Sequence, residues 1–261
     1  MPFLSGFKGD GAMASLSSKF LWFAGCLSAA VLWSGLAQAG IVIQGSRVVY
    51  PTKEREVTIK MTNIGEQPSL VQAWVDKGNE KLTADKADGP FLITPPITRV
   101  EAKKGQTLRL VYTGDDAASK KQETVFWLNV LDVPPMPKDQ DANFLQVAVR
   151  SRLKIFFRPE GLPGNPNQTA EGLNWSVVQA GHGYALRARN TGAFHVSLAT
   201  VQLVAGNKTF SVDKDDMKMV APGASVDLPL PGLAGQPGAG ARIDYQWVTD
   251  YGALSQHESP L

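Results

Sequence analysis

Beyond about residue 40, apolar side chains occur on alternate positions in short segments that clusters of Gly, Pro, Asn and Asp separate. In one segment Val57, Ile59 and Met61 alternate with polar residues, and similar segments recur roughly every 8–15 residues, as in sandwich folds. Successive side chains of a strand point to opposite faces of a sheet, so this pattern indicates half-buried strands. No amphipathic helix of ten or more residues is evident, and residues 117–122 have room for one helical turn. The chain is therefore predicted to be all-β, with antiparallel sandwiches.

A break in the pattern follows Pro159. The segment EGLPGNPNQ at 160–168 consists almost entirely of turn formers, and strand-like segments resume after it. We interpret residues 161–168 as a linker between a first domain at 40–160 and a second domain at 169–261. About 220 residues are long enough for two domains of roughly 100 residues each.

The N-terminal segment has the features of a secretory signal peptide. Lys19 precedes an apolar run at 20–36, and the small-residue tripeptide AQA at 37–39 follows. We expect export, with residues 1–39 removed and Gly40 as the first mature residue; Met13 is an alternative start. The run is shorter and richer in small residues than a membrane span of about 20 apolar residues. The alternative is an uncleaved N-terminal anchor.

The single cysteine, Cys26, lies inside this segment. The FAGC at 23–26 weakly resembles a lipoprotein cleavage box, but few apolar residues precede it. A mature chain without cysteine has no disulfide, so an exported protein of this kind depends on its apolar cores for stability.

The composition and motifs argue against several classes of function. Lys plus Arg total 26 and Asp plus Glu 24, so the net charge is near zero and does not suggest binding to nucleic acid. His182, His195 and His257 lack metal-ligand spacing and are interpreted as surface residues, and the acidic run at 213–216 as a solvated turn. Paired carboxylates and a glycine-rich phosphate loop are also missing. We therefore predict neither an enzyme nor a bound metal or cofactor, and core packing for the tryptophans.

The segment LQVAVRSRLKIFFRP at 145–159 is the strongest candidate for a functional strand, predicted at about 143–158. Leu145, Val147 and Val149 share one face of such a strand. An ordinary core-facing strand is the simpler interpretation. However, the preceding loop at 134–141 is rich in proline and charge, and the alternate face carries cations that are costly to bury unpaired: Arg150, Arg152, Lys154 and Arg158. The strand is thus suited to hold the edge of another protein and its C-terminal carboxylate.

Several motifs in order give the chain a resemblance to the periplasmic chaperones of the chaperone–usher pilus pathway. The strongest is FWLNVLDVPP at 126–135, followed by the LxVxV strand and KIFFRP at 154–159. The supporting motifs are RVVYP at 47–51, QAW at 72–74, TPP at 94–96 and TDYGA at 249–253.

This resemblance implies two immunoglobulin-like β-sandwich domains arranged as an L with an interdomain cleft. It implies that Arg47 and Lys154 bind the C-terminal carboxylate of a pilus subunit, through charge-assisted hydrogen bonds of about 1.5–3 kcal/mol each. It further implies a donor strand, in which Leu145, Val147 and Val149 fill a groove that the subunit leaves open.

The resemblance also implies a buried salt bridge between the domains, formed by Glu123, Arg158 and Asp250; three unconnected surface charges are the alternative. A cis peptide is expected at Thr94–Pro95 or Pro95–Pro96. Two features depart from the family pattern: the second domain lacks a disulfide, and its segment at 190–195 lacks the usual proline. The short loop at 134–143 resembles that of chaperones for rod-type pili.

The function implied is that of a periplasmic chaperone, independent of ATP, that stabilises pilus or fimbrial subunits by donor-strand complementation. It would deliver them to an outer-membrane usher, and the free chaperone could self-associate through its exposed strand. The alternatives are a two-domain fimbrial structural subunit or adhesin, and a secreted sugar-binding or hydrolytic sandwich.

Overall fold

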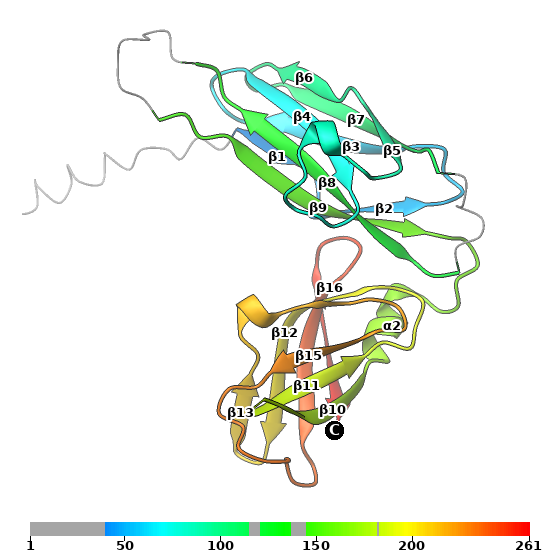
Figure 1. Ribbon diagram of the computed structural model, residues 1–261, viewed down its shortest axis with the longest axis vertical. Helices are drawn as coiled ribbons and strands as arrows, with labels where there is room; N and C mark the ends of the chain where they lie inside the picture. The colour runs from blue at the N-terminus through cyan, green and yellow to red at the C-terminus, as the bar shows by residue number, and fades with distance from the viewer. Residues whose placement is uncertain (1–39, 115–120, 137–144, 182) are drawn as a thin grey trace, which may run out of the picture. The chain divides into compact units, whose positions relative to one another are not determined.

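The computed structural model describes residues 40–114, 121–136, 145–181 and 183–261 (Figure 1). The predicted signal peptide at 1–39, His182 and the first residues of the predicted donor strand lie outside this part of the chain. Ala39–Leu261 forms one compact unit.

The first sandwich consists of two sheets that enclose one apolar core. One sheet has the order β1 (Ile41–Ile43), β3 (Val57–Asn63), β7 (Gly105–Tyr112) and β5 (Phe91–Thr94). The other has the order β2 (Arg47–Pro51), β9 (Val149–Arg158), β8 (Thr124–Val133), β4 (Ser69–Asp76) and β6 (Ile97–Val100). Leu108 and Leu110 from the first sheet meet Leu128, Ile155 and Phe157 from the second in the core.

The second sandwich has its own core. Its smaller sheet has the order β10 (Asn174–Ala180), β11 (Gly183–Arg189) and β15 (Ser225–Pro229). The larger sheet has the order β13 (Lys208–Ser211), β12 (Val196–Ala205), β16 (Arg242–Val248) and β17 (Leu254–Pro260), and β14 (Met219–Val220) pairs with β12. Leu186 and Leu228 pack against Leu203, Ile243 and Tyr245. The prediction of an all-β chain with two sandwiches is confirmed.

The connection between the sandwiches differs from the predicted linker. Asn165 caps the short helix α2 (Pro166–Glu171): its side chain accepts a hydrogen bond from the Gln168 amide, and Pro166 occupies the first turn. The last part of the predicted linker is therefore helical. No helix within the described residues is long and apolar enough to cross a membrane. Two short 3-10 turns, η1 (Ala84–Lys86) and η3 (Lys214–Asp216), complete the elements.

Strand β9 presents one face to the core and the other outward. Leu153, Ile155 and Phe157 are buried in the core, so strand alternation puts Lys154 and Arg158 on the outer face. Strand β2 runs parallel to β9, with Arg47 in register with Lys154 and Pro51 with Arg158. Antiparallel pairing with β8 places Trp127 opposite Lys154.

The predicted strand begins later than expected. β9 starts at Val149, which is in register with Asp132 near the end of β8. Residues 145–148 have no strand assignment, and in the described part of the chain no strand pairs with them. Their partner strand has already ended: after Val133 come Pro134 and Pro135, which lack the amide hydrogen that a ladder needs. The peptide bond Thr94–Pro95 is cis.

Candidate functional site

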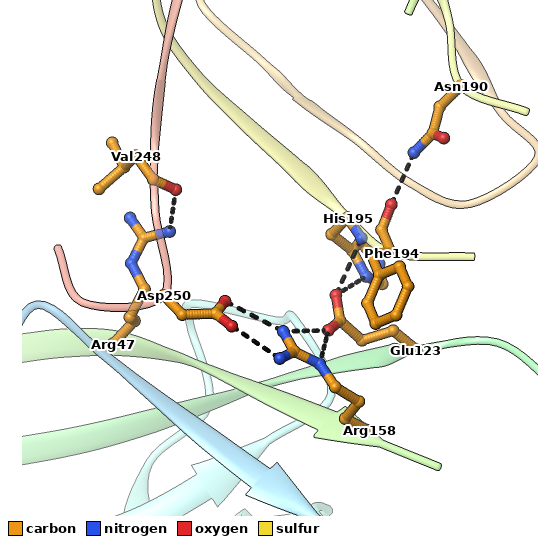
Figure 2. A network of polar contacts seen from close by, with 8 residues as sticks. All are labelled: Arg47, Glu123, Arg158, Asn190, Phe194, His195, Val248 and Asp250. Atoms are coloured by element: carbon orange, nitrogen blue, oxygen red, sulfur yellow. Dashed lines mark hydrogen bonds and ion pairs between the residues drawn. The ribbon is translucent and has the colours of Figure 1, made fainter. Parts of the chain in front are cut away.

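Arg47 and Lys154 lie side by side on neighbouring strands, β2 and β9. The Arg47 Nη1 donates a hydrogen bond of 2.8 Å to the carbonyl oxygen of Val248, at the end of β16 in the second sandwich (Figure 2). Its guanidinium carbon is 5.7 Å from the centre of the Phe156 ring. The Lys154 Nζ is 5.5 Å from the centre of the Trp127 ring. Aromatic and backbone groups thus hold both cations near one another.

Within the described part of the chain, these two cations lack the paired carboxylate that partly buried cations usually have. Among the residues that the structure describes, neither forms an ion pair, and the buried Arg47 Nε has no hydrogen-bond partner. Burial lowers the pKa of Lys154, and the positive charge of Arg47 lowers it further. Burial also lowers the pKa of Arg47, against the opposing effect of the Asp250 charge. An incoming anion would relieve this unfavourable electrostatic situation.

The predicted donor residues form an exposed apolar row, which we call the donor row: Leu145, Val147 and Val149. Their side chains are 88%, 58% and 56% exposed. A few residues further along the same segment, Leu153 and Ile155 are buried. A row of exposed aliphatic side chains on a segment with unpaired backbone groups is typical of a protein-binding edge.

Arg158 lies at the end of the same strand and has partners on two sides (Figure 2). Its Nε and Nη2 lie 2.7 Å from Oε2 of Glu123, and its Nη1 and Nη2 lie 2.7 and 3.0 Å from the Asp250 carboxylate. The Glu123 side chain is 1% exposed. Burial lowers the pKa of Arg158, but the bonds and charges of Asp250 and Glu123 outweigh it and raise the pKa overall. The structure thus brings Glu123, Arg158 and Asp250 together.

His195 belongs to the same network, and its interpretation as a surface residue is wrong. Its side chain is 5% exposed, with Nδ1 3.0 Å from Oε1 of Glu123, and its backbone amide donates to the same oxygen at 2.8 Å. The loop that carries it is fixed by buried Asn190, whose Nδ2 donates to the carbonyl of Phe194. In the sequence, the loop that carries His195 is marked by its departure from the family pattern at 190–195. His257 is partly buried, with its ring 5.8 Å from that of Tyr245.

Arg152 is also partly buried and is paired with Asp76. The sequence alone did not predict this pair. Its Nη2 lies 2.7 Å from the fully buried Asp76 carboxylate, and its guanidinium covers the Trp127 ring at 4.2 Å. Burial raises the pKa of Asp76, but hydrogen bonds from Asn129, Arg152 and Gly78 outweigh it and lower the pKa overall. Trp127, which we expected in the core, instead lies on the outer face between Arg152 and Lys154.

The described residues contain no group of three or more His, Cys, Asp or Glu side chains placed to hold a metal ion. The site is instead an apolar row followed by two cations that no carboxylate of the described residues pairs with. Such an arrangement can bind an extended peptide edge and a terminal carboxylate.

Comparisons with known proteins cover nearly all of the described chain. Residues 40–163 match the N-terminal domain of the pili and flagellar-assembly chaperone PapD, and residues 168–259 match the C-terminal domain of the pili assembly chaperone PapD. The probable fimbrial chaperone YadV of Escherichia coli K12 is 36% identical over 239 residues, 90% of this chain and 96% of that protein. The chaperone protein FimB/FhaD of Bordetella pertussis is 36% identical over 233 residues, 86% of this chain and 89% of that protein.

Solved structures show the same fold. The crystal structure of the YadV chaperone has a TM-score of 0.73 at 35% identity and covers 85% of this chain and all of that one, 100%. The Salmonella enterica SafA pilin in complex with the SafB chaperone gives a TM-score of 0.69 at 27% identity, with 87% of this chain and 99% of that chain covered. Both domains, the sequence relatives and the solved structures agree: this chain belongs to the PapD family of pilus-assembly chaperones.

Proposed function

We propose that this chain is a periplasmic chaperone that binds pilus or fimbrial subunits by lending them a strand. The observation that carries the proposal is the continuity of strand β9 with the exposed donor row and with Lys154, which lies beside Arg47. Membership in a chaperone family favours this function over the alternatives of a fimbrial structural subunit, an adhesin or a sugar-binding sandwich.

The donor row would supply the apolar side chains that complete a subunit core. Burial of each of Leu145, Val147 and Val149 would stabilise the complex by about 1.5–3 kcal/mol before the costs of association. The backbone groups of residues 145–148, which pair with no described strand, are available to hydrogen-bond with the edges of a subunit groove. A solved complex of a related chaperone with a pilin, SafB with SafA, supports a pilus subunit as the partner.

Arg47 and Lys154 form what we call the carboxylate anchor. A C-terminal carboxylate placed between them would receive charge-assisted hydrogen bonds from both cations. Its position would fix which subunit residue faces each member of the donor row, because a strand that slips by one residue exchanges its faces. The anchor therefore contributes register as well as affinity.

Export and delivery complete the proposal. Residues 1–39 act as a signal peptide that is removed between Ala39 and Gly40, which places the mature chain in the periplasm. The chaperone then passes each subunit to an outer-membrane usher, and the free protein protects its donor row by self-association. The Glu123–Arg158–Asp250 network holds the two sandwiches together during this cycle. The chaperone binds a subunit without making or breaking a covalent bond.

A peptide-binding experiment tests the carboxylate anchor. The purified chaperone is titrated with a fluorescent peptide that matches the C-terminal strand of a pilus subunit from the same organism, as the free acid and as the amide. We expect the free acid to bind at least tenfold more tightly, and Lys154→Met to abolish this difference. Lys60→Met, which removes an exposed strand lysine from the opposite sheet, is the matched control. Equal affinity for acid and amide would refute the anchor.

A further inference from the structure

Asp132, near the end of β8, has a partly buried carboxylate with an unusual set of partners. Its Oδ2 accepts a hydrogen bond of 2.9 Å from the Ile41 backbone amide, and its Oδ1 accepts one from the Ser69 hydroxyl. Within the described ranges no Lys, Arg or His forms an ion pair with it. Two neutral donors satisfy its lone pairs in part, but no cation of the described residues is paired with it.

The backbone of Gly40 lies directly against this carboxylate. A Cβ on Gly40 would collide with Oδ2 of Asp132 and lie 3.2 Å from Cγ, and the three atoms nearest to that position all belong to Asp132. Standard bond lengths place the Gly40 nitrogen about 2.5 Å from the same position, hence within about 5 Å of Oδ2. The Gly40 carbonyl accepts a hydrogen bond of 3.0 Å from the Ile64 amide, which holds this residue in place.

We propose that Asp132 is the binding site for the α-ammonium group of the mature N-terminus. The inference rests on the proposed export and on cleavage before Gly40. Hydrolysis of the Ala39–Gly40 bond by a signal-peptide-cleaving protease consumes one water and breaks the C–N bond. It leaves a carboxylate on Ala39 and an amine on Gly40, which takes up a proton. The neutral Gly40 amide of the precursor, close to Asp132, is thereby replaced by a cation.

The charges favour this assignment. An α-amino group titrates at about 7.7–8.0, so most of it is charged at neutral pH. A carboxylate within reach favours the charged form and raises the pKa of the amine. The ammonium group also has three hydrogens, so it can bond to Oδ2 while Ile41 keeps its own bond to that oxygen. Gly40 is suited to the position because any side chain would occupy the space of the carboxylate.

The position of Asp132 gives this contact a role in the chaperone. Asp132 is in register with Val71 of β4 on one side and with Val149, the last residue of the donor row, on the other. The bond therefore ties β1 to the point where β8 ends and the donor row joins β9. Removal of the signal peptide would stabilise this end of the first sandwich, so the precursor and the mature chain differ in stability at the place that engages a subunit.

The test compares the exported chain with a chain that retains Gln38 and Ala39, each with and without Asp132→Asn. N-terminal sequencing first establishes the start of the exported protein. The pKa of the α-amino group is then measured by NMR on each chain with the terminal residue labelled with ¹⁵N, and the unfolding equilibrium by urea titration at pH 7. The Asn side chain of the Asp132→Asn variant keeps an oxygen acceptor for the Ile41 amide. The extended chain keeps Asp132 itself. Either comparison therefore remains informative if the other protein misfolds.

We expect an α-amino pKa about one unit above the ordinary value, equivalent to a tenfold preference for the charged form in the folded chain. Asp132→Asn should restore the ordinary value, and the extended chain should unfold about tenfold more readily only when Asp132 is present. A start other than Gly40 overturns the inference but leaves subunit binding untouched. A start at Gly40 with an ordinary α-amino pKa overturns it while the proposed export stands.

Discussion

Arg158 and Lys154 lie on the same face of β9, four positions apart, and have opposite surroundings. Arg158 meets two carboxylates from its own chain, Glu123 and Asp250. Lys154 meets none among the described residues and faces Arg47 and the ring of Trp127 instead. The pKa of Arg158 is raised and that of Lys154 is lowered. We therefore expect Arg158 to stabilise the fold through its own carboxylate partners. We expect Lys154 to bind an anion from another molecule.

The largest effect should follow from removal of the paired cation. Arg158→Met leaves Glu123 buried without its strongest partner, and we expect a loss of about 3–5 kcal/mol in the free energy of unfolding, as for other broken buried ion pairs. Urea titration followed by tryptophan fluorescence measures this loss. Arg187→Met, which removes an exposed arginine paired with Asp227, is the control and should leave the midpoint unchanged. A similar, small change for both variants would remove the distinction between the two cations.

The unpaired cation should show the reverse behaviour. Lys154→Met removes a partly buried charge that pairs with no carboxylate in the described ranges, so the free energy of unfolding should stay equal or rise. The affinity for a subunit peptide should fall by about 2–3 kcal/mol, which is thirtyfold or more, because the buried carboxylate loses one of its two cations. Both quantities are measured on the same preparation. A loss of stability as large as that of Arg158→Met would show that Lys154 supports the fold instead.

The donor row gives a smaller effect of the same kind. Val147→Ser removes apolar surface that is 58% exposed in the free chaperone, so its stability should change little. Affinity for the subunit peptide should fall by about 1–2 kcal/mol, since the lost methyl groups no longer enter the groove. The matched change Leu153→Ala, in the core-facing part of β9, should instead cost about 2–5 kcal/mol of stability. Equal stability losses for both would mean that the row is packed in the free chain.

The smallest effect is expected from alkaline pH. The folded chain holds the Lys154 proton less tightly than an unfolded lysine does, since its pKa is lowered. The unfolded state therefore binds more protons between that lowered pKa and the ordinary value of about 10.4, and the free chaperone should gain stability there as pH rises. Peptide affinity should decline over the same window, because the anchor loses its charge. Lys154→Met should abolish both trends, and persistence of either in that variant would assign it to another group.

The same contrast explains how far the sequence could be interpreted. Alternation alone predicted that the cations of β9 lie opposite its apolar row, and the structure extends that apolar face into the core through Leu153, Ile155 and Phe157. Alternation also predicted that Lys154 and Arg158 share a face. Alternation could not separate the roles of the two cations, because Glu123 and Asp250 are far from Arg158 in the sequence. Only the resemblance to a family connected these three residues.

The errors have the same origin. The sequence pattern predicts His195 at the surface. In the structure the buried Asn190 fixes its loop so that the ring reaches Glu123. Arg152 is paired with Asp76, two strands away, at a distance of 76 positions in the chain. The late start of β9 follows from the end of its neighbour β8, which is a property of the sheet and not of residues 145–148. Local patterns determine faces; partners across the sheet determine where a strand begins and which charges are balanced.

The parallel pairing of β2 with β9 has a consequence for the size of what can be bound. Register fixes Arg47 beside Lys154 by main-chain hydrogen bonds, and seven positions of extended chain, about 23 Å, separate Lys154 from Val147. Both ends therefore belong to one continuous segment of backbone, which is paired in the sheet from Val149 onward. In the proposed binding mode, a subunit would fit only when the number of residues between its terminal carboxylate and its open groove matches that length. An insertion of two residues between the row and the anchor would change the accepted length by about 7 Å without altering a single contact group.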